Sequence, residues 1–163
     1  MPVGIYISVP FCRSKCSYCN FASGVFAREM VTGYGERVCA DIRRAQQTAS
    51  AMGGILECKA DSVYLGGGTP TTLTPEQFER IFGALRQEFE IDPAAEITVE
   101  CAPGALAPEM LQVLVRAGVN RVSLGVQSFV TRELARTGRK HTAEVVEREI
   151  GRASCRERVS NCV

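Results

Sequence analysis

The sequence contains no tryptophan, a single histidine and almost no net charge. A formal net charge of +1 over 163 residues removes the electrostatic basis for binding nucleic acid or an anionic membrane. No apolar run approaches the roughly 20 residues that a membrane-spanning helix needs. The first residues, MPVGIYISVPFC, lack the basic and apolar stretches of an export signal. We therefore expect a cytoplasmic protein with enough chain for one domain.

Cysteine, in contrast, is abundant, with eight in the chain. In a reducing compartment, a tight group of cysteines is more typical of a metal or redox site than of disulfides. One such group has the spacing C-x3-C-x2-C and consists of Cys12, Cys16 and Cys19. Three other cysteines stand alone, and we predict that each is a small buried hydrophobic residue: Cys39, Cys58 and Cys101.

The end of the chain differs in character from the rest. Residues 149–159 read EIGRASCRERV, a basic string in which the hydrophobic periodicity stops. This string matches the translation of a common sequencing-library adapter. We therefore predict that residues 1–148 are natural and belong to a longer protein. On this prediction residues 149–163, with Cys155 and Cys162, have no function; a natural polar tail is the alternative.

Strand-like and helix-like segments alternate along the chain. Apolar and β-branched runs predict strands at residues 3–9, 62–66, 96–101 and 121–126. Helical spacing of apolar residues predicts helices at residues 27–51, 74–89, 107–118 and 130–147, the last interrupted near Gly138. The helix at 74–89 is the clearest, because Thr74, Pro75 and Gln77 form the signature of a capped N-terminus.

This alternation predicts an α/β fold with parallel strands and right-handed crossovers. The four βα units amount to half of an eightfold barrel or two-thirds of a sixfold one. Chemically distinctive residues lie at the carboxyl ends of the four predicted strands: Cys12, the segment 66–69, Glu100 and Gln127. Because the carboxyl ends of parallel strands meet at one edge, where ligands bind in such folds, we expect these residues to form one site.

The cysteine spacing favours an iron–sulfur cluster. Thiolates suit zinc or iron–sulfur clusters, but a four-cysteine zinc site needs a second pair, which the sequence lacks nearby. Three thiolates on a [4Fe–4S] cluster leave one iron open to a cofactor or substrate. The alternative is a structural zinc site completed by His141 or a distant cysteine.

Four motifs, in order, carry a resemblance to a known family: IYISVPFCRSKCSYCNF, VYLGGGTPTTL, RVSLGVQSF and LARTGRKH. They resemble the radical S-adenosylmethionine (SAM) family, and within it the oxygen-independent coproporphyrinogen III oxidases and the related haem chaperones of the HemW type. The resemblance covers residues 4–148. It implies the N-terminal portion of a partial (β/α)6 TIM-type barrel.

The resemblance also implies the cofactors and their contacts. Cys12, Cys16 and Cys19 would bind a [4Fe–4S] cluster, and SAM would chelate the open iron. The implied SAM contacts are Tyr6, Tyr18, Gly67, Gly68, Thr69, Glu100, Gln127 and Arg139. In the family, the cluster reduces SAM by one electron to give methionine and a 5′-deoxyadenosyl radical. The implied partners are a porphyrin or haem ligand, an electron donor and a haem acceptor, and haem is a possible cofactor of the full-length protein.

Two positions depart from the oxidase pattern. The oxidases carry a further cysteine two residues after the third, where this chain has Phe21, and this difference favours the haem chaperones. Ala102 stands where the family usually has asparagine, which leaves the assignment of Glu100 unchanged. Three functions remain open: a haem chaperone with a radical SAM core, an oxidase that converts coproporphyrinogen III to protoporphyrinogen IX, and a metal-binding module without SAM chemistry. We expect His141 to be a polar residue at the cavity rim rather than a haem ligand.

Overall fold

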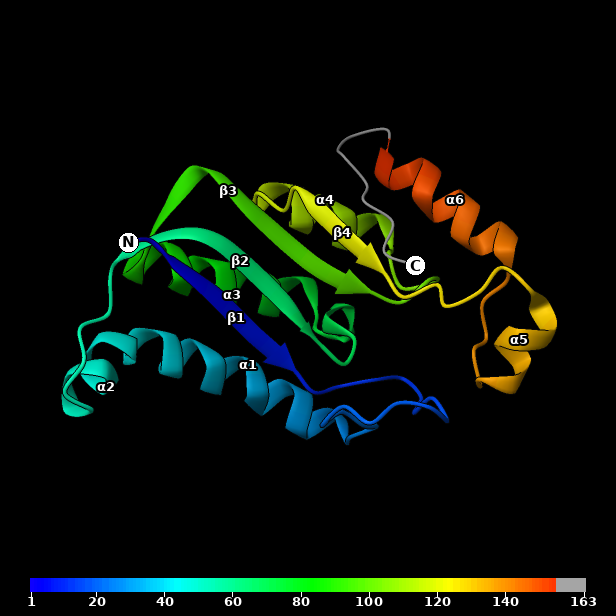
Figure 1. Ribbon diagram of the computed structural model, residues 1–163, viewed down its shortest axis with the longest axis horizontal. Coiled ribbons are helices and arrows are strands. Elements are labelled where there is room, and N and C mark those ends of the chain that lie inside the picture. The colour runs from blue at the N-terminus through cyan, green and yellow to red at the C-terminus, as the bar shows by residue number, and fades with distance from the viewer. Residues whose placement is uncertain (155–163) are drawn as a thin grey trace.

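The computed structural model describes residues 1–154, in which strands alternate with helices (Figure 1). The strands are β1 (Val3–Val9), β2 (Lys59–Gly67), β3 (Glu90–Cys101) and β4 (Arg121–Leu124). They form a parallel sheet in the order β1-β2-β3-β4. The connecting helices are α1 (Arg28–Arg43) and α2 (Ala45–Ala51) after β1, α3 (Pro75–Glu88) after β2, and α4 (Pro108–Arg116) after β3. The predicted parallel α/β fold is confirmed.

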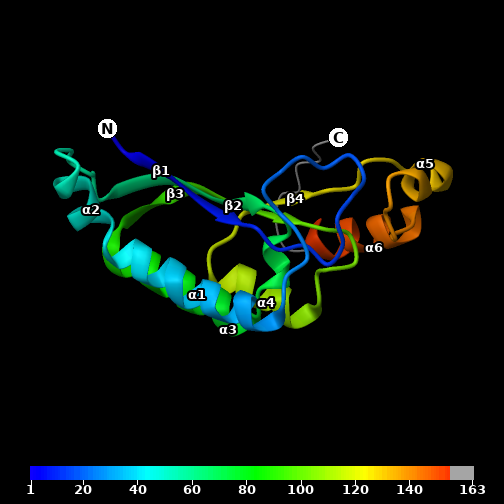
Figure 2. The same cartoon turned by 90° about the horizontal axis from the view of Figure 1, so that it is seen from below.

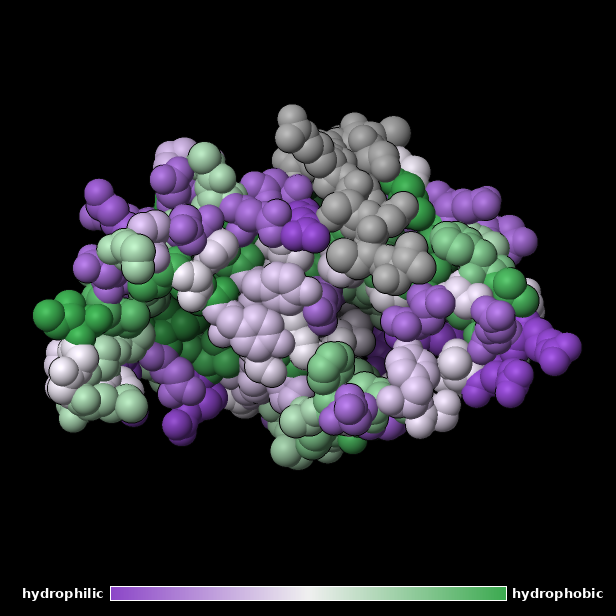
Figure 3. All heavy atoms as spheres, viewed as in Figure 1, coloured by the Kyte–Doolittle hydropathy of each residue, from purple (hydrophilic) through white to green (hydrophobic). Residues whose placement is uncertain are grey.

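Within residues 1–154, the helices α1, α3 and α4 cover one face of the sheet. Figure 2 shows helices α1, α3 and α4 gathered on one side of the strands. Val9, Leu65 and Val99 are fully buried and belong to the core cluster that includes these helices. Successive side chains of a strand point to opposite faces, so the intervening residues, among them Tyr64 and Glu100, lie on the open face. Figure 3 shows that hydrophilic and weakly hydrophilic residues cross the middle of the molecule seen from that side.

Several elements differ in extent from the sequence prediction: β2 begins three residues earlier, β4 ends two residues earlier and the last helix continues seven residues beyond 147. Two further differences have a clear structural cause. The helix predicted at 27–51 is divided at Arg44, whose amide is shared between the carbonyls of Ala40 and Asp41. Strand β3 begins six residues before the predicted 96–101 segment, because Glu90 already pairs with Lys59. Pro93 argues against a strand in the sequence, but it falls within a register irregularity, where a missing ladder amide is tolerated.

Helix α3 begins as predicted. The Thr74 hydroxyl accepts a hydrogen bond from the Gln77 amide at 3.3 Å, and the Gln77 side chain accepts one from the Thr74 amide at 2.8 Å. The apolar stripe of α3 is buried in the core: Phe78, Ile81, Phe82 and Leu85. Gln77 also donates to the carbonyl of Val31 at 2.8 Å, which ties α3 to α1.

The last described segment contains two helices, α5 (Thr131–Arg136) and α6 (Ala143–Ser154), separated near Gly138 as predicted. Glu149 of α6 is 2% exposed and accepts hydrogen bonds from the amides of Gly104 at 2.9 Å and Leu106 at 3.3 Å. The proposed boundary at residue 148 stays a prediction, and the statements on Cys155 and Cys162 fall outside the described residues. Within residues 1–154, no helix has the length and apolarity required to span a membrane.

Candidate functional site

A cavity of about 640 Å³ lies at the carboxyl ends of the four strands and is lined by the segments that follow them. Ten of the eleven predicted site residues line it: Cys12, Cys16, Tyr18, Cys19, Gly67, Gly68, Thr69, Glu100, Gln127 and Arg139. Tyr6 is the exception. Its ring lies on the open face, 60% exposed, and stacks on the ring of Tyr64 with centroids 5.8 Å apart.

The three cysteines lie in one closed loop, residues 12–24, which we call the cysteine loop. Its two ends are joined, because the Cys12 amide donates to the Gly24 carbonyl at 2.8 Å and the Gly24 amide donates to the Pro10 carbonyl at 2.9 Å. Phe11 and Gly24 form an isolated parallel bridge at the same point. The first and last residues of the cysteine loop therefore lie side by side, directly beyond the end of β1.

Inside the cysteine loop, the ammonium group of Lys15 donates to the carbonyls of Phe21 at 2.9 Å and Ser23 at 2.6 Å. The pKa of the Cys19 thiol is lowered, chiefly by the backbone amide of Phe21 and further by the Ser23 hydroxyl and the Lys15 charge. A lower pKa favours the thiolate, the form that binds metals. Lys15 was not among the predicted site residues, although a cation between Cys12 and Cys16 was a visible signal.

The aromatic residues at the cysteine loop differ in exposure. Phe11 is buried and makes edge-to-face contacts with the rings of Phe26 and Tyr34. Phe21, in contrast, is 66% exposed. Among the isolated cysteines, Cys39 and Cys101 are buried as predicted, but Cys58 is exposed and the prediction for it was wrong. It lies in the segment before β2, outside the core.

Three consecutive glycines at the end of β2 are each required for a different structural reason. A Cβ atom on Gly66 would lie 2.6 Å from a ring carbon of Tyr64, and Gly67 has φ +108°, which disfavours other residues. A Cβ atom on Gly68 would lie 2.6 Å from the carbonyl oxygen of Phe11. Absence of a side chain at Gly68 thus lets the end of β2 approach the entrance of the cysteine loop.

Backbone hydrogen bonds hold that close approach. The Gly68 amide donates to the Val9 carbonyl at 2.8 Å, and the Thr69 amide donates to the Phe11 carbonyl at 2.7 Å. The Thr69 hydroxyl lies 3.9 Å from the sulfur of Cys12. The GGGT segment is therefore both a wall of the cavity and a support for the first cysteine.

Glu100 is fixed by two donors. One carboxylate oxygen accepts from the Tyr64 hydroxyl at 2.7 Å, and the other accepts from the Gly67 amide at 3.0 Å. Burial, followed by the bond to Glu100, raises the pKa of Tyr64 to about 12, so the phenol keeps its proton at neutral pH. Tyr64 was missed in the sequence. Its position two residues before Gly66, on the same face of the strand, was the available signal.

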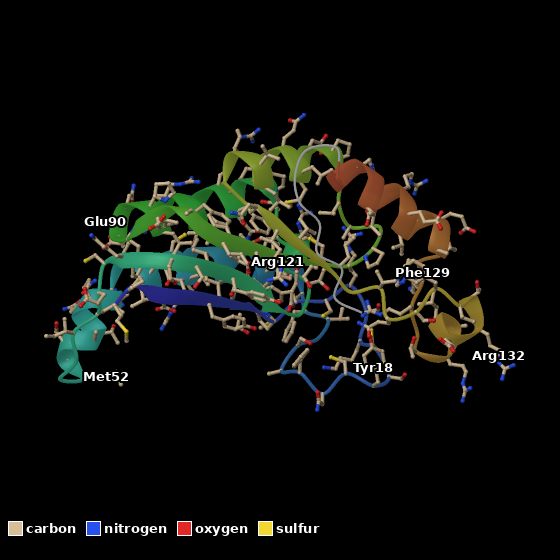
Figure 4. All side chains as sticks on the ribbon, turned by 45° about the horizontal axis from the view of Figure 1, so that its top comes forward. Tyr18, Met52, Glu90, Arg121, Phe129 and Arg132 are labelled. Carbon is tan, nitrogen blue, oxygen red and sulfur yellow. The ribbon has the colours of Figure 1, made fainter. Side chains whose placement is uncertain are left out.

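Arg139 and Tyr18 join the two sides of the cavity. The guanidinium donates to the Tyr18 hydroxyl from Nε at 3.2 Å and Nη2 at 2.8 Å, and it lies 6.0 Å from the ring centroid. Figure 4 shows Tyr18 in the loop after β1, beside the segment that follows β4. Burial raises the pKa of Tyr18 more than Arg139 lowers it. These two predicted site residues therefore contact each other directly.

Gln127 and His141 line the cavity on the side opposite the cysteine loop. Gln127 has φ +71° and is the one non-glycine residue with positive φ in the described part of the chain. Such backbone strain is concentrated at functional sites. His141 lines the cavity, and its Nε2 atom lies 3.0 Å from the Val126 carbonyl oxygen. Burial lowers the pKa of His141, so its neutral form is favoured.

Comparison with known proteins relates this geometry to a family. The model of the radical SAM superfamily matches residues 6–154. The heme chaperone HemW of Lactococcus lactis is 35% identical over 141 residues, which cover 86% of this chain and 35% of that protein. The oxygen-independent coproporphyrinogen III oxidase of Bradyrhizobium diazoefficiens is 37% identical over 126 residues, covering 77% of this chain and 27% of that protein.

The solved structure of coproporphyrinogen III oxidase (HemN) from Escherichia coli, described as a radical SAM enzyme, superposes with a TM-score of 0.80 at 25% identity. The match covers 98% of this chain and 36% of that one. This chain spans about a third of the length of these relatives. The family model alone covers most of the chain, and the parallel α/β fold agrees with the superposition on HemN. The chain belongs to the radical SAM superfamily.

Proposed function

We propose that residues 1–148 form a radical SAM core that holds a [4Fe–4S] cluster on Cys12, Cys16 and Cys19 and binds SAM in the adjoining cavity. The single observation that carries this proposal is the convergence of ten predicted residues on one cavity. They come from the carboxyl ends of the strands and from the segments that follow them. A cluster reduced by one electron would supply the electron that cleaves SAM.

The donor set fits a multinuclear cluster. All three cysteines are partly exposed and line the cavity. Within the described part of the chain, no three histidine, cysteine or carboxylate side chains are gathered so as to hold a single metal ion. A cubane binds each thiolate to a different iron, so its ligands need not converge on one point. The choice of the cluster over a structural zinc site rests on the C-x3-C-x2-C spacing, which has no nearby second cysteine pair to complete a four-cysteine zinc site.

The remaining residues are suited to orient SAM. The Glu100 carboxylate has about four acceptor sites, so after bonding Tyr64 and Gly67 it can still accept hydrogen bonds from a ligand. Arg139 offers several fixed donors, and the Tyr18 ring gives a flat apolar surface for an adenine. Both now contact each other. We infer that a bound ligand would share or replace this contact.

Within the family, we propose the haem-chaperone function. Phe21 occupies the position where the oxidases carry a fourth cysteine. This difference is our reason for preferring the chaperone function to the oxidase function. The oxidase remains the second candidate, because a curated oxidase is 37% identical over part of its length. Anaerobic incubation of the intact protein with reductant, SAM and coproporphyrinogen III separates them. Formation of protoporphyrinogen IX supports the oxidase, whereas haem binding without that product supports the chaperone.

The test of the cluster and of SAM binding is anaerobic iron–sulfur reconstitution, followed by EPR spectroscopy of the reduced protein with and without SAM. We expect a [4Fe–4S] signal whose shape changes when SAM is added, because SAM would bind the open iron. A folded protein that takes up zinc and no cluster would contradict the proposal and support the metal-binding module.

Replacing Tyr64 with phenylalanine is expected to weaken SAM binding about fivefold, since a hydrogen bond to a charged group is lost. Glu100 then keeps only the Gly67 amide to fix it. Equilibrium binding of labelled SAM measures the effect. Tyr34→Phe is the matched control, because its hydroxyl donates to the Ser8 carbonyl at 2.6 Å, away from Glu100. Equal losses of affinity in both variants would argue against a specific role of Tyr64.

Replacing Gln127 with glycine is expected to separate stability from binding. Glycine removes the cost of the positive φ, so the free energy of unfolding should be unchanged or raised by up to about 1 kcal/mol. SAM affinity should fall about fivefold, because a polar group of the cavity is lost. Gln127→Ala keeps the backbone strain and serves as the control. Urea unfolding and SAM binding measure the two effects, and a less stable glycine variant would indicate a structural role.

A further inference from the structure

Few contacts shape the interior of the cysteine loop. Its ends are joined by backbone bonds of Cys12 and Gly24, and short turns are formed by the Cys19 amide to the Cys16 carbonyl and the Ser23 amide to the Phe21 carbonyl. None of these bonds connects the first half of the loop to residues 20–23. The rest of the loop therefore depends on side chains for its shape.

Lys15 makes that connection. Its ammonium group has three donors, and two of them reach the carbonyls of Phe21 and Ser23 at 2.9 and 2.6 Å. These carbonyls lie six and eight residues further along the chain. Arg13, in the same spacer, also lines the cavity but makes no hydrogen bond or ion pair to any residue from 1 to 154. The bridging is therefore specific to Lys15 and is not a general property of cations in the loop.

We propose that Lys15 is a positioning residue that holds the cysteine loop in the shape that receives the cluster. This inference rests on the proposed cluster of Cys12, Cys16 and Cys19. The bonds of Lys15 hold residues 21–23 next to the spacer between the first two cysteines. The third cysteine is therefore held beside Cys12 and Cys16 in the cluster-free chain. Its positive charge also lies next to a site that becomes negative when thiolates bind.

The test compares three variants of the full chain. Lys15→Met keeps the length of the side chain but removes the charge and the donors, Lys15→Arg keeps both, and Arg13→Met removes one charge from the same spacer without removing a described bond. In the cluster-free chain, the hydrogen-exchange rates of the Ser23 and Gly24 amides measure how well the shape of the cysteine loop is held. After reconstitution, the half-life of the cluster absorbance in the presence of an iron chelator reports how well the cluster is held.

In Lys15→Met we expect the Ser23 and Gly24 amides to exchange about fivefold faster, and the cluster to be lost about fivefold faster, because two charge-assisted bonds are missing. The Thr69 amide, which bonds to Phe11, should be unchanged and excludes general unfolding. Lys15→Arg should recover most of both losses, and Arg13→Met should behave as the unmodified chain.

Three results from the variants would overturn the inference, and a fourth, from the unmodified chain, would overturn it together with the proposed function. Unchanged exchange in Lys15→Met would mean that the bonds do not shape the loop, whether or not the chain takes up a cluster. Faster exchange with unchanged cluster retention would mean that the shape is irrelevant to the cluster. Equal effects of Lys15→Met and Arg13→Met would reduce the role of Lys15 to net charge. Failure of the unmodified chain to bind a cluster would sink the proposed function as well, and is recognised by the EPR experiment.

Discussion

A chain in which Cys19 is replaced by serine is expected to lose its iron–sulfur cluster. Serine is a much poorer ligand for iron than a thiolate, and Cys19 is the cysteine whose pKa the loop lowers. After anaerobic reconstitution, the iron content should fall from about four per chain to less than about one, with loss of the visible absorbance. Colorimetric iron and sulfide analysis measures the change.

Cys58→Ser is the matched control for that experiment. Cys58 is exposed and lies outside the cavity, with its sulfur 3.4 Å from the amide nitrogen of Gln46. Its replacement should leave the iron content unchanged. A cluster that survives in Cys19→Ser but is lost in Cys58→Ser would place the ligands elsewhere and refute the assignment of the C-x3-C-x2-C group.

Replacing Gly68 with alanine is expected to cause the second large effect. The added Cβ atom would lie 2.6 Å from the Phe11 carbonyl oxygen and 2.9 Å from the Val9 carbonyl oxygen, and both are backbone atoms that cannot rotate away. The end of β2 must then separate from the entrance of the cysteine loop. We expect the free energy of unfolding to fall by about 3 kcal/mol. Cluster uptake should fall with it, because the loop loses its support.

Gly83→Ala provides the opposite control. Gly83 lies inside α3, and a Cβ atom there would meet nothing within 4 Å. Alanine is the better helix former, so this variant should be more stable by about 0.5 to 1 kcal/mol and should keep its cluster. Urea unfolding monitored by circular dichroism compares the two. Similar stability of Gly68→Ala and the unmodified chain would show that the strand end can move without cost.

The parts of the fold that were predictable carry local signals. Helix α3 has its start marked by Thr74 and Gln77 and its buried face marked by a 3.6-residue period, and both are found in the structure. The first residues of strand β3 had no such local signal in the sequence. Its early residues, Glu90 and Ile91, are placed by pairing with β2, a contact between segments far apart in the sequence. Local patterns cannot reveal that pairing.

The same distinction applies to the site. Residues that follow a strand or belong to a motif were predictable, because their position along the chain fixes their place at the sheet edge. Lys15 and Tyr64 act through hydrogen bonds to Ser23 and Glu100, and these depend on how the chain folds back on itself. Cys58 was predicted to be buried but is exposed. A lone cysteine carries no sequence signal that distinguishes the surface from the core.

The backbone bonds between the GGGT segment and the entrance of the cysteine loop have a consequence for biosynthesis. The described bonds that close the cysteine loop and tie it to the GGGT segment involve residues up to Thr69, whereas Arg139, which reaches Tyr18 across the cavity, is made 70 residues later. At about 5 to 20 residues per second, a ribosome takes about 4 to 14 seconds to add that stretch. Until then the contact between Tyr18 and Arg139 cannot form, so the cysteine loop is synthesised well before the residue that joins it to the far side of the cavity.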